Sequence, residues 1–96
     1  MTKGGAVYIL TNKNNNVLYT GVTSNLPVRM YQHKFKNYHI AFTSRYSVNK
    51  LVYYKRFQSI VEAIAEEKRI KSGSRKNKII LVETLNPNWD DLSIQL

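Results

Sequence analysis

The sequence AVYILTNKNNNVLYTGV, residues 6–22, decides the fold of this chain. Its two ends, residues 6–11 and 17–22, are short and rich in β-branched and aromatic side chains, which favour strands. Residues 13–16 between them are mostly asparagine, which tolerates left-handed turn conformations. We therefore predict an antiparallel hairpin, with Tyr8 and Tyr19 near the middle of its strands and able to project from one face.

A helix is predicted next, because Ser24 or Asn25 can cap it and Pro27 suits its first turn. Its helical wheel places an apolar side against a polar one. The predicted apolar side consists of Val28, Tyr31, Phe35 and Tyr38, and the polar side of Arg29, Gln32, His33 and Lys36.

The second half of the chain predicts a third strand over residues 51–57 and two further helices. One begins at Ser59 with Glu62 three positions later, which is a capping-box pattern, and Gly73 ends it after about residue 71. The last helix starts near Ser74 or Arg75 and is closed by Asn86 and the proline after it.

The predicted fold class is α+β, a small three-stranded antiparallel sheet flanked by helices in the order β-β-α-β-α-α. A chain of 96 residues is expected to form a single domain over residues 1–96. Residues 1–5 and about 90–96 are expected to be loose termini.

Composition excludes several classes of protein. The chain has no cysteine, which excludes disulfides, iron–sulfur clusters, thiol catalysis and cysteine-based zinc sites. No apolar run approaches the roughly 20 residues that span a bilayer, and no signal peptide is recognisable. We expect a soluble, cytoplasmic protein.

The charge balance points to an anionic partner. Fifteen Lys and Arg residues against six Asp and Glu residues give a net charge of +9. Such a basic domain is a candidate for binding nucleic acid. The alternatives are a merely soluble basic protein or one that meets anionic lipid or ribosomal RNA.

Glu67 stands out on the helix that begins at Ser59. It falls within the apolar stripe of Ile60, Ala63, Ile64 and Ile70, where an unpaired carboxylate is costly. One interpretation is a position at the edge of the stripe, or a local salt bridge to Lys71. The other is a ligand for a hard divalent cation, since Mg²⁺ needs only one or two protein carboxylates.

Two further residue pairs have both a functional and a structural interpretation. Arg29 and His33 lie four residues apart, so both could meet one phosphate, although such a pair is commonly just a solvated face. Tyr8 and Tyr19 are also ordinary core residues of a sheet.

These residues together resemble the GIY-YIG nuclease superfamily. The two tripeptides AVY at 6–8 and YTG at 19–21 are similar to the pair that names it, and Arg29, His33 and Glu67 follow in the family's order. The resemblance runs from about residue 6 to residue 89. It is greatest to small stand-alone bacterial members related to the nuclease domain of the excision-repair subunit that makes the 3′-side incision. Ala6, Val7 and Thr20 depart from the family pattern at positions that shape the strands.

The resemblance implies metal-assisted phosphodiester hydrolysis, with Mg²⁺ or Mn²⁺ as the cofactor and Glu67 as its ligand. It implies that Tyr8 activates or positions the attacking water and that Tyr19 orients the water or the phosphate. Arg29 would stabilise charge on the phosphate, and His33 would move a proton or hold Tyr8. Gly21 would allow a tight backbone turn beside the site. Family members often carry an asparagine late in the site, and the candidates for it here are Asn77 and Asn86.

The implied substrate is DNA, with RNA as the alternative, and the implied pathway is repair or recombination. No sequence-reading module is recognisable, so weak sequence specificity and a possible targeting partner are expected. Tyr38 and Tyr46 could stack on bases. The residues predicted to bind nucleic acid are Lys34, Lys36, Arg45, Lys50, Arg75, Lys76 and Lys78. Two alternatives remain, a non-catalytic nucleic-acid-binding module with the nuclease fold and an accessory subunit that needs a partner.

Overall fold

The computed structural model describes residues 4–35 and 47–96. Its elements are β1 (Gly5–Thr11), β2 (Leu18–Thr23), α1 (Leu26–Phe35), β3 (Lys50–Phe57), α3 (Ile60–Lys71), α4 (Arg75–Leu85) and the 3-10 helix η1 (Leu92–Gln95). The predicted α+β class and element order are confirmed, and the predicted bounds of the strands and of the last two helices lie within one or two residues of the observed ones. The predicted end of the first helix lies outside the described residues. The short helix η1 was not predicted.

The three strands form an antiparallel sheet in the order β2-β1-β3. Tyr8 of the central strand faces Gly21 on β2 and Tyr54 on β3. The hairpin turn works as the asparagines predict, because Asn15 has a φ of 57° and donates its backbone N–H to the carbonyl of Asn12 at 3.0 Å.

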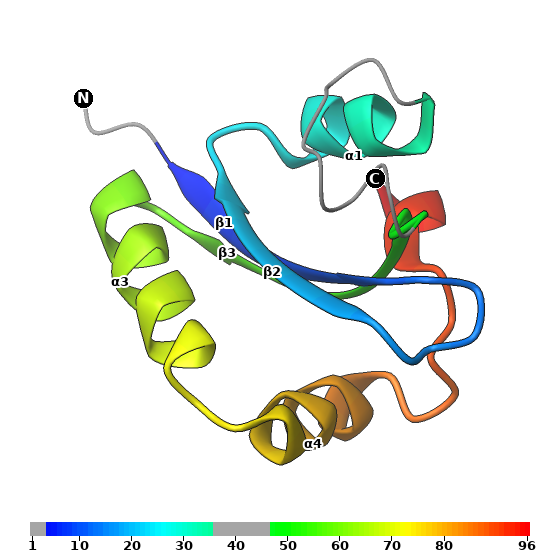
Figure 1. Ribbon diagram of the computed structural model, residues 1–96. Coiled ribbons are helices and arrows are strands. Elements are labelled where there is room, and N and C mark those ends of the chain that lie inside the picture. The colour runs from blue at the N-terminus through cyan, green and yellow to red at the C-terminus, as the bar shows by residue number, and fades with distance from the viewer. Residues whose placement is uncertain (1–3, 36–46) are drawn as a thin grey trace.

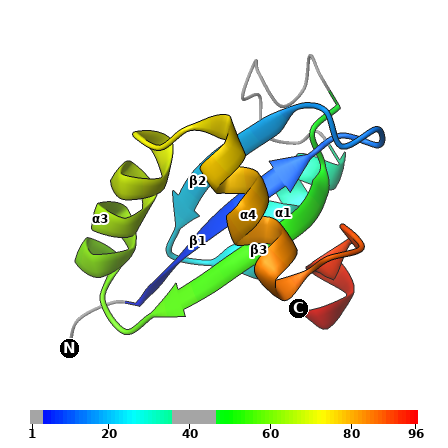
Figure 2. The ribbon, with the colours of Figure 1, turned by 90° about the horizontal axis from the view of Figure 1, so that it is seen from below.

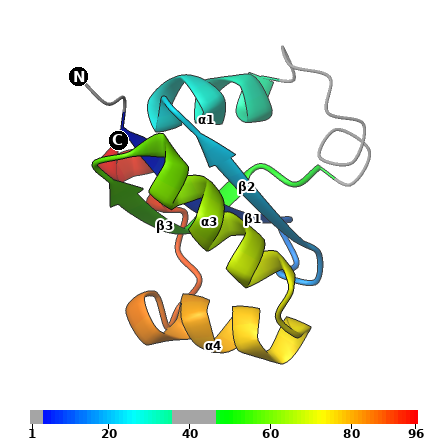
Figure 3. The ribbon, with the colours of Figure 1, turned by 90° about the vertical axis from the view of Figure 1, so that its left-hand side faces the viewer.

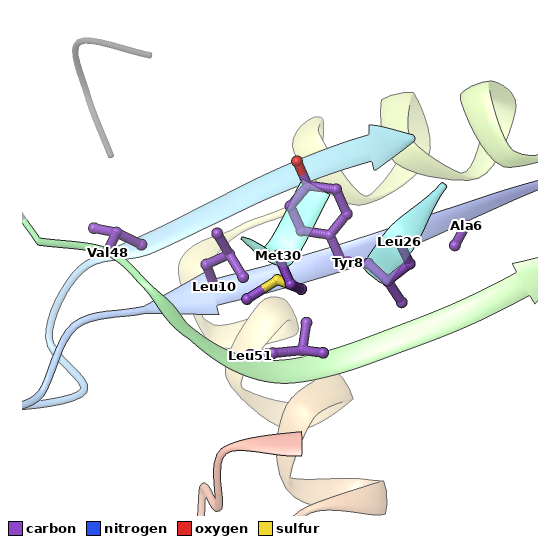
Figure 4. Packing of buried hydrophobic residues seen from close by; sticks show 7 residues of the cluster. All are labelled: Ala6, Tyr8, Leu10, Leu26, Met30, Val48 and Leu51. Carbon is purple, nitrogen blue, oxygen red and sulfur yellow. The ribbon is translucent and has the colours of Figure 1, made fainter. Parts of the chain in front are cut away.

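Helices cover both faces of the sheet, as Figures 1 and 3 show. Alternate residues of β1 point to opposite faces, so two apolar clusters form. The first lies under α1 and contains Ala6, Tyr8, Leu10, Leu26, Met30, Val48 and Leu51 (Figure 4). The second lies on the face of the sheet that α3 and α4 cover, which Figure 2 shows from below. It contains Val7, Ile9, Val52, Tyr53, Ala63, Ile70 and Val82. Burial on both faces explains why β1 is a nearly continuous apolar run.

The predicted apolar side of α1 is wrong. Val28 and Tyr31 are 51% and 57% exposed, whereas Leu26, Met30 and His33 are buried. These three residues are spaced i, i+4, i+7 and form a stripe of their own. Leu26 and Met30 pack into the first cluster. Because His33 lies on the same stripe of α1, it also faces the sheet. Tyr38, the last residue of the predicted side, lies outside the described residues.

The C-terminal segment, for which a loose tail is expected, contacts the exposed edge of β3. Asp91 accepts a hydrogen bond from the backbone N–H of Leu51 at 3.2 Å, and the Asn86 side-chain amide donates to the carbonyl of Val52 at 3.0 Å. Asp91 also pairs with Lys34 of α1 at 2.7 Å. The segment therefore ties β3 to α1. In the described part of the chain, no helix is long and apolar enough to cross a membrane.

Candidate active site

Three aromatic rings meet above the face of the sheet that α1 covers. Tyr8 comes from β1, Tyr19 from β2 and His33 from α1, and their ring centroids are 5.9–6.4 Å apart. The hydroxyl of Tyr8 lies 3.3 Å from Nε2 of His33 within hydrogen-bonding distance. Tyr8 is fully buried and His33 is 5% exposed. We call Tyr8, Tyr19 and His33 the aromatic cluster.

Gly21 makes room for this cluster. Figure 4 shows the Tyr8 hydroxyl pointing away from the aliphatic side chains and toward β2. A Cβ atom on Gly21 would lie 2.5 Å from both Cζ and the hydroxyl oxygen of Tyr8. The tight turn expected at Gly21 is wrong, because the residue is paired within β2 and does not have a positive φ. Its contribution is space for the neighbouring tyrosine.

Burial raises the pKa of Tyr8 well above its ordinary value, and the nearby Tyr19 raises that pKa further. Arg29 opposes this rise through its positive charge and a hydrogen bond to Tyr8, whereas the negative charge of Glu67 adds to it. The Tyr8 hydroxyl is therefore protonated at neutral pH and is a hydrogen-bond donor.

Burial lowers the pKa of His33 from 6.5 to about 4, and the charge of Arg29 lowers it as well. The imidazole is therefore neutral near pH 7 and keeps one nitrogen as an acceptor. A protonated phenol beside a neutral imidazole supports donation from the Tyr8 hydroxyl to Nε2 of His33. Nδ1 of His33 is buried and has no partner among the described residues.

Arg29 on α1 and Glu67 on α3 both act electrostatically on Tyr8, so the structure brings these two predicted residues to the aromatic cluster. Glu67 is recessed, with its side chain 13% exposed, and its carboxylate pairs with Lys71 at 2.9 Å. The local salt bridge that the sequence offered as one interpretation is thus present. The neighbouring Glu66 has a separate partner, Arg69, which donates to both of its oxygens at 2.6 and 2.7 Å.

The donor set at this site fits a hydrated hard cation. The described residues contain no group of three or more His, Asp or Glu side chains that could hold a metal ion. A single recessed carboxylate, Glu67, still meets the need of Mg²⁺ or Mn²⁺, which keep several waters and take further oxygens from a substrate phosphate. A zinc site takes three or four His, Cys or carboxylate ligands from the protein, and no such group occurs among the described residues.

The residues predicted to bind nucleic acid are spread over several elements, and most have partners within the protein. Lys34 pairs with Asp91, and Lys78 donates to the carbonyl of Gly73 at 3.0 Å. Lys50 and Arg75 both donate to the hairpin turn, to Asn15 at 2.9 Å and to the carbonyl of Asn16 at 2.8 Å. Lys76 is exposed on α4. Lys36 and Arg45, like Tyr46, lie outside the described residues.

The two asparagines considered for the late position of the family have different surroundings. Asn86 is 4% exposed, and its side chain bonds the carbonyls of Val52 and Asp90 and the N–H of Asp90. Its amide is therefore used in holding the C-terminal segment. Asn77 lies in the first turn of α4 and lines a groove between α3, α4 and β3.

A groove of about 680 Å³ lies between α3, α4 and β3, under the opposite face of the sheet from the aromatic cluster. Its lining includes Tyr53, Ile70, Ile80, Leu81 and Leu85. None of the predicted catalytic residues lines it. The predicted catalytic side chains and this groove are thus separate.

Comparison with known proteins identifies the family. Residues 4–79 match the model of the GIY-YIG catalytic domain, so the chain belongs to the GIY-YIG family. The fold and the site thereby define a nuclease-type domain, and the resemblance noted in the sequence is confirmed. The family indicates an endonuclease that acts on DNA, and GIY-YIG nucleases are generally metal-dependent.

A solved structure gives a more particular comparison. The UPF0213 protein BH0048 from Bacillus halodurans, determined in solution by NMR, is 28% identical in sequence over 92% of each chain, with a TM-score of 0.58. No curated protein matches the chain significantly.

Proposed function

We propose that this protein is an endonuclease that hydrolyses phosphodiester bonds of DNA with the help of Mg²⁺ or Mn²⁺. Its catalytic residues would be Tyr8, Tyr19, Gly21, Arg29, His33 and Glu67. The observation that carries the proposal is the hydrogen bond between a protonated Tyr8 and a neutral His33, with Arg29 beside them.

The aromatic cluster could hold the attacking water in place. The Tyr8 hydroxyl, which lies 3.3 Å from Nε2 of His33, would position that water against the phosphate. Burial raises the pKa of Tyr8 and lowers that of His33, so the pair is proposed to orient the water rather than to keep its proton. The ring centroid of Tyr19 lies 6.4 Å from that of Tyr8, and Tyr19 would orient the water or the phosphate.

Charge on the phosphate is balanced by Arg29 and by the cation. The Arg29 guanidinium stabilises the charge that grows on the phosphate oxygens, an effect worth about 3–4 kcal/mol for a well-placed donor. Glu67 would hold the divalent cation, which supplies electrophilic stabilisation of the scissile phosphate and the leaving oxygen when bound. The expected products carry 5′-phosphate and 3′-hydroxyl ends.

The DNA backbone would follow the basic end of α3 and the start of α4. Exposed Lys68 and Lys71 lie one and four residues after Glu67, and Arg75 and Lys76 open the next helix. Contacts between basic side chains and backbone phosphates contribute affinity but carry no information about the base sequence. Further phosphate contacts are proposed for Lys34, Lys36, Arg45, Lys50 and Lys78, with stacking by Tyr38 and Tyr46.

Recognition is proposed to depend on the shape of the DNA rather than on its sequence, with roles in repair or recombination. The whole chain, residues 1–96, would act as one cytoplasmic domain, and a partner protein would supply any targeting.

The test is cleavage of a panel of plasmid, single-stranded, flap and branched DNA with Mg²⁺, with Mn²⁺ and with EDTA. Wild type is compared with Glu67→Gln and with Glu66→Gln, a neighbouring acid that pairs with Arg69 instead. We expect metal-dependent cleavage that Glu67→Gln abolishes and Glu66→Gln retains.

Equal cleavage by wild type and Glu67→Gln would contradict the assignment of Glu67. Salt-sensitive DNA binding without cleavage of any substrate would instead support a non-catalytic binding module or a nuclease that needs a partner. Loss of DNA binding altogether would favour an accessory role.

A further inference from the structure

Two acid–base pairs lie side by side on α3, and they differ in strength. Arg69 holds both oxygens of Glu66 at 2.6 and 2.7 Å. Lys71 reaches Glu67 with a 2.9 Å contact between its ammonium and one carboxylate oxygen. A two-pronged guanidinium contact is stronger and more directional than a single contact to a flexible ammonium. The Lys71 contact is therefore the one that another cation can replace more easily.

The environment of Glu67 requires some cation. Its side chain is 13% exposed, whereas that of Lys71 is 54% exposed. A recessed carboxylate is costly without a compensating charge. The Lys71 ammonium supplies that charge. Because the Lys71 side chain is exposed, it can move away from Glu67 and be hydrated by solvent.

We propose that Lys71 occupies the place of the divalent cation at Glu67 in the metal-free protein and is displaced when the cation binds. This inference rests on the proposed function, in which Glu67 is the cation's ligand. Lys71 is then a positioning residue, because it holds the carboxylate in place and sets how tightly the cation binds. The exchange trades one ion pair for another and needs no change in the backbone of α3.

The test is a titration of the DNA-free protein with Mn²⁺, in which the free ion is followed by its electron paramagnetic resonance signal. The variants are Lys71→Gln, Glu67→Gln and, as a control of equal charge on the same helix, Arg69→Gln. We expect Lys71→Gln to bind Mn²⁺ about two- to fivefold more tightly than Arg69→Gln does, as an exposed ion pair would allow. Circular dichroism checks that each variant keeps its helices.

The outcomes separate the two proposals. If Glu67→Gln loses Mn²⁺ binding while Lys71→Gln and Arg69→Gln bind equally, Glu67 remains the ligand and Lys71 is no competitor. If Glu67→Gln binds as wild type does, the metal assignment itself fails and the Lys71 proposal fails with it. Absence of Mn²⁺ binding by both wild type and Lys71→Gln also overturns the Lys71 proposal, because displacement requires a bound cation.

Discussion

Gly21 is the residue on which the position of Tyr8 depends. The change Gly21→Ala would place a methyl group 2.5 Å from the Tyr8 ring and hydroxyl, so the ring must move. Overpacking of this kind costs about 1–3 kcal/mol. We predict that Gly21→Ala lowers the free energy of unfolding by that amount, as measured by urea denaturation, and abolishes any nuclease activity.

The matched control is Gly73→Ala. There the nearest atom to a new Cβ is the carbonyl oxygen of Ile70 at 3.3 Å, and the backbone φ is not positive. This variant should destabilise less than Gly21→Ala, because a contact of 3.3 Å can be relieved by a shift of a few tenths of an ångström. Equal stability of Gly21→Ala and wild type would show that Tyr8 does not need the space.

His33 gives the fold a dependence on pH. Its pKa is about 4 in the folded protein against 6.5 for a free side chain, so between those values only the unfolded chain binds a proton there. Stability at neutral pH is therefore lost as the pH falls from about 6.5 to 4, by up to about 3 kcal/mol. We predict that His33→Gln flattens this loss, as seen in urea unfolding curves at a series of pH values. Parallel losses in variant and wild type would contradict the lowered pKa.

At the scale of elements, the sequence predicts most of what is found because hairpin and helix signals are local. Asn15 in its turn and the cap at Ser59, whose hydroxyl accepts from the N–H of Val61 at 3.2 Å, act between neighbours in the chain. The buried side of α1 was mispredicted because apolar residues occur on both sides of that helix. Whether Met30 or Tyr31 is buried depends on how the helix packs against the sheet.

The cover of β3 by Asn86 could not be predicted, because its partner Val52 is 34 residues away in the chain. The change Asn86→Ala leaves the carbonyls of Val52 and Asp90 and the N–H of Asp90 without this partner. We predict a loss of about 2–3 kcal/mol in the free energy of unfolding.

Two further variants sharpen the Asn86 test. Asn86→Asp has the same shape but turns the donor toward two carbonyl oxygens into an acceptor, so it should destabilise at least as much at pH 7. Asn88→Ala, an exposed asparagine of the same segment, should have little effect. If Asn86→Asp is as stable as wild type, the hydrogen bonds of the amide are not the cause.

At the scale of the whole molecule, the net charge of +9 predicts DNA affinity that falls steeply with salt. The double change Arg75→Gln and Lys76→Gln should reduce the slope of log affinity against log KCl concentration by about 1–2. Fluorescence anisotropy with labelled duplex in EDTA measures this slope. The charge-matched pair Lys55→Gln and Arg56→Gln on β3 should change it less, and the reverse order would move the binding surface to β3.

The candidate site shows where sequence reasoning ends. The order of Tyr8, Arg29, His33 and Glu67 predicted that distant parts of the chain come together, because a family resemblance carries information about contacts between distant residues. In the structure His33 lies beside Tyr8, and Arg29 and Glu67 act electrostatically on Tyr8. The salt bridge of Glu67 and the burial of His33 needed the structure, since both depend on which face each helix presents. Individual DNA-binding lysines could not be ranked from sequence, because a lysine with an internal partner looks the same there as one without.

The side chains of Asn86 and Asp91 have a consequence for how the protein behaves in concentrated solution. An uncovered outer strand offers backbone groups as a template to which a strand of another molecule can add, and aggregation begins at such places. Here the N–H of Leu51 and the carbonyl of Val52 are already bonded by side chains of the same chain. Truncation before Asn86 would therefore expose a ready site for assembly into fibres, even if the remaining chain still folded.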